Sequence, residues 1–164
     1  MAKLLSALPV GSVVKSTNTK YNGKVIRWIV GTQDTANGRT GLVAEKMITL
    51  KCFDAKEPSN TNSDRKNYGN NRYSQSNIDQ WLNSQAAAWY SARHSYDAPP
   101  NNANVWSNYN EYDTEAGFLS NFEADFRNAI LDAVIRVAKN TVTDGGGYEA
   151  VSYTHLRAHE TAAN

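Results

Sequence analysis

The first third of the chain alternates β-prone runs with tight turns. Residues 10–15 form a short β-prone run, and Asn22-Gly23 is typical of a two-residue hairpin turn. The branched and aromatic run at 24–30 follows directly. The pattern predicts a β-hairpin.

A third strand is expected before Asp54. A predicted turn at 37–41 leads into an apolar run at 42–53, which Glu45 and Lys46 interrupt. The interruption indicates a bend within this strand. Residues 58–74 are polar and show no period, which predicts a loop.

Two later segments carry the 3.6-residue period of an amphipathic helix. Ser76 and Asp79 have the spacing of a capping box, and the apolar positions of one face follow: Ile78, Trp81, Leu82, Ala86 and Trp89. This spacing predicts a helix over 78–90. Ser120 and Glu123 form a second box, and apolar residues recur at intervals of four: Phe118, Phe122, Phe126 and Ile130. We expect a helix over 121–131, then a strand over 133–138 and a flexible break at the glycines of 145–147.

The middle of the chain is rich in loop-forming residues. Asparagine accounts for 19 of the 164 residues, and twelve of these lie between Pro58 and Asp113. Asparagine favours turns and side-chain hydrogen bonds to the backbone, and two prolines exclude a helix over 97–104. We therefore expect long, ordered loops around few regular elements.

Length and charge limit the function classes. A chain of 164 residues is enough for one domain, and its net charge of +1 gives no field that would attract nucleic acid. Its single cysteine, Cys52, excludes an internal disulfide framework. The N-terminus shows neither a secretory signal nor a membrane span. We expect synthesis in the cytoplasm without a signal peptide, and no membrane insertion.

The last fourteen residues, 151–164, differ from everything before them. Residues 151–161 match, in order, one reading frame of the transposon-end adapter used in sequencing libraries. We interpret 151–164 as a non-native, adapter-derived tail and exclude it from fold reasoning. The alternative is a zinc site at His155 and His159, which have i, i+4 spacing but would need a third ligand.

Several blocks along the chain resemble one protein family. They are Leu8-Pro9-Val10-Gly11-Ser12-Val13-Val14-Lys15, Tyr21-Asn22-Gly23-Lys24 with Trp28, the run 45–54, Tyr68-Gly69-Asn70-Asn71-Arg72-Tyr73 leading to Gln80-Trp81-Leu82-Asn83-Ser84, the run 97–110, and Glu115-Ala116-Gly117-Phe118-Leu119 with Val137-Ala138-Lys139-Asn140-Thr141. Together they resemble domain of unknown function 6273, a family of bacteriophage and gut-bacterial proteins. The resemblance spans about residues 8–150.

This resemblance implies a fold and a context, but no established activity. Members look like C-type-lectin-like domains, related in shape to formylglycine-generating enzymes, and are encoded among phage structural genes or as cell-surface modules. Members also continue into a Trp-Trp-Leu-Arg block and a Gly-Val-Arg-Pro block, which this sequence lacks. We therefore expect residues 1–150 to be the N-terminal part of one α+β, C-type-lectin-like domain. In this truncated domain, two helices would pack on a small antiparallel sheet.

Two groups of residues in one loop are candidates for ligand contact. Trp106, Tyr109 and Tyr112 could stack on sugar rings or anchor an interface, or they could pack beneath the loop. Four oxygen-bearing residues could hold calcium: Asn108, Asn110, Glu111 and Asp113. The alternative is a loop ordered by its own hydrogen bonds, without a cofactor. The spacing Asn60-x-Asn62-x-Asp64 starts like an EF-hand, but Arg65 and Asn71 stand where glycine and glutamate belong.

The sequence offers weaker candidate residues for catalysis and for nucleic-acid binding. Cys52 would need a base such as His94, and a lone cysteine in an apolar run is more often a buried apolar residue. We expect His94 to provide a favourable charge at the end of the first helix instead. Arg65, Lys66 and Arg72 lie near Tyr68 and Tyr73, as in a nucleic-acid surface, but acidic residues nearby argue against that function.

The sequence favours a non-enzymatic binding module. It would be a phage structural or tail-associated protein, or a bacterial surface protein, and would recognise a host-surface glycan or protein through loops on a rigid scaffold. One alternative is a relative of formylglycine-generating enzymes with catalysis in a missing C-terminal half. Another is a purely structural virion protein that contacts other virion proteins. Because a sheet that lacks strands leaves unpaired edges, we also expect aggregation or marginal stability.

Overall fold

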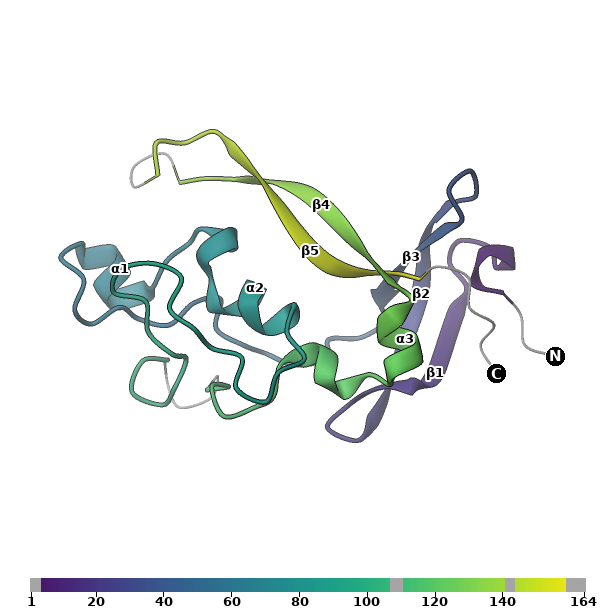
Figure 1. Cartoon of the computed structure of the whole chain (residues 1–164), viewed down its shortest axis with the longest axis horizontal. Coiled ribbons are helices and arrows are strands. Elements are labelled where there is room, and N and C mark those ends of the chain that lie inside the picture. The colour runs from purple at the N-terminus through teal and green to yellow at the C-terminus, as the bar shows by residue number, and fades with distance from the viewer. Residues whose placement is uncertain (1–3, 107–110, 141–143, 159–164) are drawn as a thin grey trace. The chain divides into compact units, whose positions relative to one another are not determined.

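The computed structural model describes residues 4–106, 111–140 and 144–158, without the side chains of 152–158. The chain divides into two compact units (Figure 1). The sheet unit comprises Met1–Thr49, Asn121–Ala133 and Thr154–Asn164. The loop-rich unit comprises Leu50–Ser120 and Val134–Tyr153.

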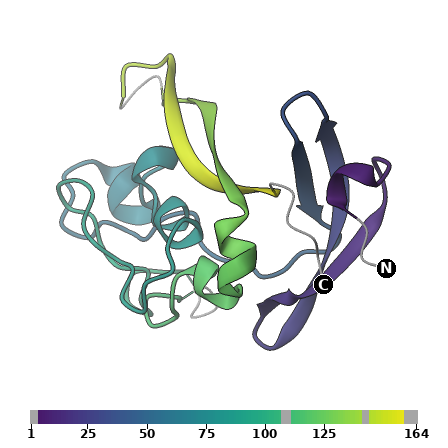
Figure 2. The same ribbon diagram turned by 45° about the vertical axis from the view of Figure 1, so that its right-hand side comes forward.

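Three antiparallel strands form the sheet unit: β1 (Val13–Tyr21), β2 (Lys24–Asp34) and β3 (Arg39–Ala44) (Figure 2). Asn22 and Gly23 connect β1 to β2 with φ angles of 48° and 74°. Two positive φ angles are the requirement of a type I′ turn, which asparagine and glycine meet at low cost. The predicted hairpin and third strand are confirmed. The third strand ends at Ala44 and a bend follows at Glu45-Lys46, but the predicted continuation of the strand to residue 53 is wrong.

Alternate residues of β2 make the core of the sheet unit. Ile26, Trp28 and Val30 are buried on one face, as the period of two requires. The Trp28 indole N–H donates to Thr19 Oγ1 at 3.0 Å, and Phe122 meets the indole edge-on at 6.4 Å between centroids. The 3-10 helix η1 (Leu5–Ala7) lies before β1, and Gln33 of β2 donates to the Leu5 carbonyl at 2.8 Å.

Helix α3 (Ala124–Asn128) lies against β1. The Glu123 N–H donates to the Asn18 carbonyl at 2.9 Å, and the 3-10 helix η3 (Phe118–Asn121) comes before α3. The predicted helix over 121–131 is wrong in length. Glu123 is the N-cap without a side-chain cap bond, and the branched run from Ile130 is taken into a strand.

Strands β4 (Ile130–Ala138) and β5 (Tyr148–Ala158) form a second antiparallel pair, drawn from green to yellow in Figure 1. The strand order is β1-β2-β3-β5-β4, and β5 pairs with β3 at Thr40 with Ala158 and Gly41 with Arg157. Strand β5 contains residues 151–158, which the sequence analysis excluded, and Val151 is buried. The side chain of His155 and the whole of His159 lie outside the described residues.

In the loop-rich unit, α1 (Ser63–Tyr68) and the 3-10 helix η2 (Tyr73–Gln75) lie where the sequence predicted only a loop. The cause is a local cap, because Asn62 Oδ1 accepts from the N–H groups of Asp64 and Arg65 at 3.0 and 3.1 Å. Helix α1 ends at Gly69, with φ 80°.

Helix α2 (Asn77–Leu82) has the predicted N-terminus, but its predicted extent over 78–90 is wrong. Ser76 Oγ accepts from the Asp79 N–H at 3.3 Å, as the cap pattern requires. After Leu82 the backbone bonds elsewhere, since the N–H groups of Leu119 and Gly117 donate to the carbonyls of Ser84 and Ala86. Trp89 is buried as expected, but from a loop.

The molecule is therefore a small α+β protein. Three α-helices occur among the described residues where the sequence predicted two, and only α3 belongs to the sheet unit. Residues 97–104 contain turns and no helix, as expected. Within the described ranges, no helix has the length and apolar character needed to cross a membrane.

Candidate functional site

Tyr112 belongs to the core of the loop-rich unit and is fully buried. Its ring stacks on Trp89 with centroids 5.3 Å apart and meets Trp81 edge-on at 5.6 Å. Its hydroxyl donates to the Cys52 carbonyl at 3.0 Å. This corrects the expectation that Tyr112 contacts a ligand, and the alternative of packing beneath the loop applies to it.

Trp106 is a surface residue, with 56% of it exposed. Its ring stacks on Tyr68, the last residue of α1, with centroids 5.9 Å and planes 11° apart. Tyr68 is itself 67% exposed, and Lys56 Nζ lies 5.0 Å from the Trp106 ring. We call Tyr68, Trp106 and Lys56 the aromatic platform. Tyr109 lies outside the described residues.

Only half of the proposed calcium set is described. Asn108 and Asn110 fall outside the described residues, whereas Glu111 is exposed and Asp113 half-buried. Among the residues that the structure describes, no group of three His, Cys, Asp or Glu side chains gathers as a metal site would require. Calcium binding therefore stays a hypothesis.

Cys52 is not poised as a nucleophile. Burial raises the pKa of its thiol to about 11, so almost no thiolate is present near neutral pH. The contacts of His94 run elsewhere, to Glu57 at 2.8 Å and Asp97 at 3.9 Å. His94 also lies twelve positions beyond the end of α2 at Leu82, in a loop, so the expectation that it ends the first helix is wrong.

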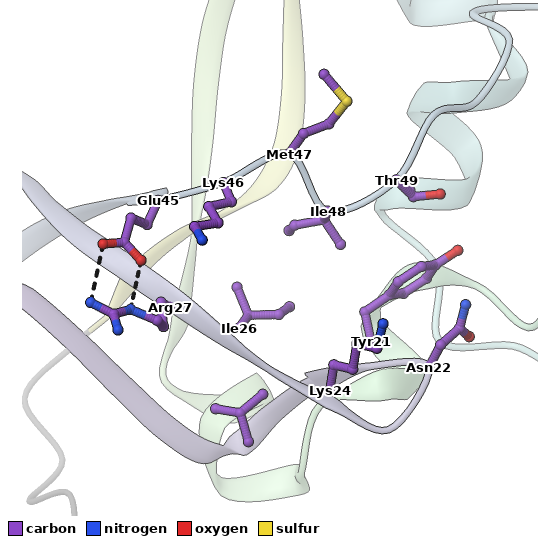
Figure 3. Close-up of a pocket in the computed structure, with 11 residues that line it drawn as sticks. Tyr21, Asn22, Lys24, Ile26, Arg27, Glu45, Lys46, Met47, Ile48 and Thr49 are labelled. Carbon is purple, nitrogen blue, oxygen red and sulfur yellow. Dashed lines mark hydrogen bonds and ion pairs between the residues drawn. The ribbon is translucent and has the colours of Figure 1, made fainter.

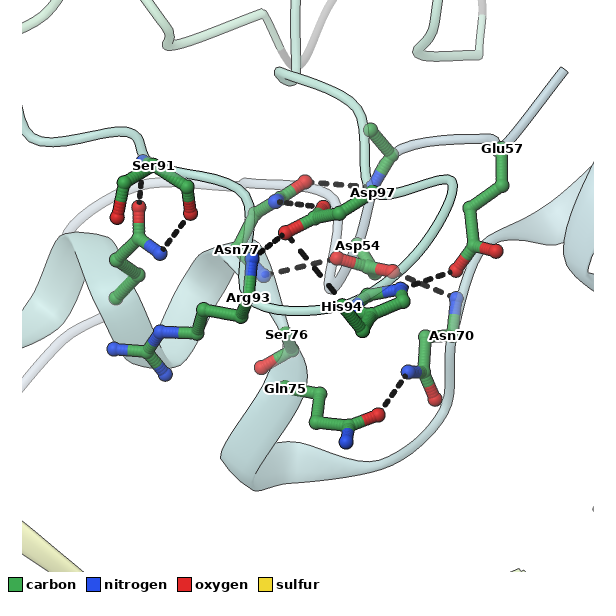
Figure 4. A network of polar contacts seen from close by, with 12 residues as sticks. Asp54, Glu57, Asn70, Gln75, Ser76, Asn77, Ser91, Arg93, His94 and Asp97 are labelled. Atoms are coloured by element: carbon green, nitrogen blue, oxygen red, sulfur yellow. Dashed lines mark hydrogen bonds and ion pairs between the residues drawn. The ribbon is translucent and has the colours of Figure 1, made fainter. Parts of the chain in front are cut away.

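A buried polar network holds the loops of this unit together (Figure 4). Asp54 accepts from the backbone N–H groups of Asn70 and Asn77 at 2.7 and 2.9 Å. Asn77 accepts from the Ala55 N–H at 2.8 Å and donates to Asp97. Burial raises the pKa of Asp54 to about 6, although the two N–H bonds act in the opposite direction.

The network continues to the surface through His94. His94 Nε2 contacts Glu57 Oε1, and the Glu57 side chain is fully buried. Asn60 donates to the other oxygen of Glu57. These contacts fix the loop that carries Ser95 and Tyr96, and Tyr96 has the unusual φ of 71°.

A hollow of about 530 Å³ opens beside this network, and we call it the polar hollow. It is lined mainly by charged and amide side chains, among them Asn62, Arg65, Arg72 and Asp144, together with His94 and Tyr96. Arg65 Nη2 contacts Asp144 Oδ1 at 2.9 Å, and Arg72 Nε contacts both oxygens of Glu149 at 3.0 Å. Two of the three basic residues considered for nucleic acid, Arg65 and Arg72, are thus paired with carboxylates here.

Asp144 has a buried polar atom without a hydrogen-bond partner among the described residues, as His94 also has at Nδ1. Its side chain is only 7% exposed, and Oδ2 is buried without a hydrogen-bond partner. The sequence analysis did not single out Asp144, Tyr96 or Gln75. Arg65, Arg72 and His94 were considered in the sequence for other roles, and the rhythm of Asn60, Asn62 and Asp64 serves to cap α1.

A second hollow, of about 400 Å³, lies in the sheet unit between β2 and the segment that follows β3 (Figure 3). Tyr21, Ile26 and Ile48 give it an apolar wall. Arg27 and Glu45 form an ion pair at its edge, with Nε and Oε2 2.6 Å apart.

Comparison with known proteins identifies the family. The family model of domain of unknown function 6273 (DUF6273) matches residues 37–157. This range contains the blocks from residue 45 onward, leaves out the two that precede Asn37, and extends seven residues beyond Ala150. No curated protein and no solved structure matches the chain. The family match covers more than half of the sequence, and the chain therefore belongs to the DUF6273 family.

Proposed function

We propose that this chain is a non-enzymatic binding module that recognises a host-surface glycan or protein. In this proposal it acts in a phage virion, as a structural or tail-associated protein, or on a bacterial surface, and its fold is a variant of the C-type-lectin-like domain. The proposal for the setting and the fold draws on the family resemblance alone.

The observation that carries the proposal is the aromatic platform. Two rings lie exposed on the surface, and each is held by the stack with the other. A pre-stacked ring loses little conformational entropy on binding and offers a large apolar face, with the cation of Lys56 beside it. Such a surface suits the apolar face of a sugar ring or an aromatic anchor of a protein partner.

The chemistry of Cys52 favours binding over catalysis. Its raised pKa and the pairing of His94 with Glu57 leave no activated nucleophile at this cysteine. The alternative of a formylglycine-generating relative therefore gains no support from Cys52.

Binding to cells tests the proposal. We expect the labelled full chain to bind some members of a panel of gut bacteria, and Trp106→Ala to lose at least about tenfold in affinity, as for a central aromatic contact. The matched control is Tyr148→Ala, since Tyr148 is 60% exposed and also lies against a cation, with Arg136 4.0 Å from its ring. Failure of the native chain to bind any cell or immobilised glycan, or equal losses in both variants, would contradict the proposal.

A further inference from the structure

We propose that the polar hollow binds an uncharged saccharide, with Asp144 as the acceptor for its hydroxyl groups. This inference rests on the proposed function in one respect, that the ligand is a glycan. The residues are different from those of the aromatic platform, so the two sites can be tested separately.

Asp144 Oδ2 provides the first argument. A buried carboxylate oxygen without a partner is costly, because water has been lost and no donor replaces it. Asp144 Oδ1 is already held by Arg65 at 2.9 Å, which fixes the orientation of the carboxylate. A ligand that donates a hydrogen bond to Oδ2 would satisfy this atom.

The balance of charge indicates that the ligand is neutral. Each guanidinium group of the hollow has an anionic partner, since Arg65 contacts Asp144 and Arg72 contacts Glu149. His94 contacts Glu57. Two guanidinium groups oppose a metal cation, and the buried carboxylate of Asp144 opposes an anion. The lining thus places the hydrogen-bond donors of two arginines beside the acceptor of Asp144. The vicinal hydroxyl groups of a sugar suit such a lining, because each can donate and accept a hydrogen bond.

Tyr96 adds an apolar surface to the same hollow. It is 49% exposed and lines the hollow from a turn in which its φ is 71°. Non-glycine residues with such a φ cost energy and recur at ligand sites. An aromatic ring next to oriented polar groups suits a pyranose, which has an apolar C–H face and a polar rim.

The experiment titrates the full chain with methyl glycosides of glucose, galactose and mannose, with sialic acid as the charged comparator. Binding is followed by ligand-observed NMR and calorimetry. We expect at least one methyl glycoside to bind. In Asp144→Asn, the amide oxygen can still accept from Arg65 while the nitrogen replaces Oδ2. We expect this variant to bind about ten- to a hundredfold more weakly, as for loss of a hydrogen bond to a charged group.

A second variant and a control separate binding from folding. Tyr96→Ala should also lose affinity without a change in the thermal midpoint, because the ring is exposed. Trp106→Ala should bind the methyl glycoside as the native chain does. The inference is overturned if no methyl glycoside binds, if sialic acid alone binds, or if both Asp144→Asn and Tyr96→Ala keep native affinity.

The two proposals fail in different ways. Loss of cell binding in Trp106→Ala does not depend on Asp144, and glycoside binding in solution does not require a cell. A native chain that binds cells but no glycoside overturns this inference and leaves the proposed function standing. A native chain that binds a glycoside but neither cells nor immobilised glycans contradicts the proposed function and leaves this inference standing.

Discussion

At the scale of single residues, the loop-rich unit depends on carboxylates that bond to the backbone. Asp54 lies before α1. It accepts N–H bonds from Asn70, which follows α1, and from Asn77, the first residue of α2, and so joins these segments. Burial makes its charged form expensive, and the nearby Asp97 and Glu57 carboxylates increase that cost. The same side chain therefore organises the loops and opposes folding when it is ionised.

Asp54 should make the protein more stable at mildly acidic pH. Its pKa rises from 3.8 to about 6 on folding, so the folded chain takes up the proton first as the pH falls. The free-energy cost of ionised Asp54 is fully present only well above pH 6 and is relieved as the pH falls through 6 toward 4, for a total of about 3 kcal/mol from this group. Chemical denaturation of the native chain at pH 7 and pH 5 measures it.

The control for this prediction is Asp54→Asn, which cannot titrate. Its free energy of unfolding should change less between pH 7 and pH 5 than that of the native chain. The variant also loses one acceptor for a backbone N–H, so it is compared by its pH slope and not by its absolute stability. Equal slopes in the two proteins would contradict the assignment to Asp54.

At the scale of elements, short helices are ended by the neighbouring backbone and not by their own sequence period. Gly69 ends α1 at φ 80°, and a Cβ placed there would lie 2.4 Å from the Ala55 carbonyl oxygen. The residue is required for two reasons, its positive φ and the close approach of the 54–55 backbone. This approach brings Asp54 to the Asn70 N–H.

Gly69→Ala should destabilise the protein more than the same substitution at a matched glycine, Gly147. Gly147 has a similar φ of 77°, but a Cβ there would meet nothing within 4 Å. Gly147→Ala should cost about 1–2 kcal/mol for the left-handed backbone alone. Gly69→Ala adds a steric clash to the same backbone cost. Thermal unfolding of both variants measures the difference, and equal costs would show that the clash relaxes freely.

At the scale of the whole molecule, the strand order leaves β1 and β4 as edges. β4 is the weaker edge, because beyond Ile130 all its residues are half-buried or exposed, and Val134 is 70% exposed. A strand with an apolar exposed residue and unpaired backbone groups is a template for pairing with another chain.

Self-association through β4 should follow from this edge. Sedimentation velocity over a range of concentrations should show oligomers of the native chain, and Val134→Lys should reduce them by placing a charge on the edge. The matched control is Val43→Lys, since Val43 is 61% exposed but lies on the inner strand β3. If all three proteins stay monomeric, or if Val43→Lys has the same effect, β4 is not the associating edge.

The local elements were the part that the sequence by itself determined. The Asn22-Gly23 turn, the alternation in β2 and the Ser76 cap each depend on residues a few positions apart, whose conformational preferences act in any context. The family and the burial of Trp28, Trp81 and Trp89 were also readable, since both rest on motif order and apolar character.

Only the tertiary structure decided where the helices end and which polar residues meet. The period over 78–90 indicated a long helix, but the carbonyls of Ser84 and Ala86 bond to a segment more than thirty positions away. In the same way, Tyr112 became core while Trp106 stayed exposed, and Arg65 met Asp144 across 79 positions. Contacts between distant segments leave no periodic trace in the sequence, because they depend on how the chain closes its loops in space.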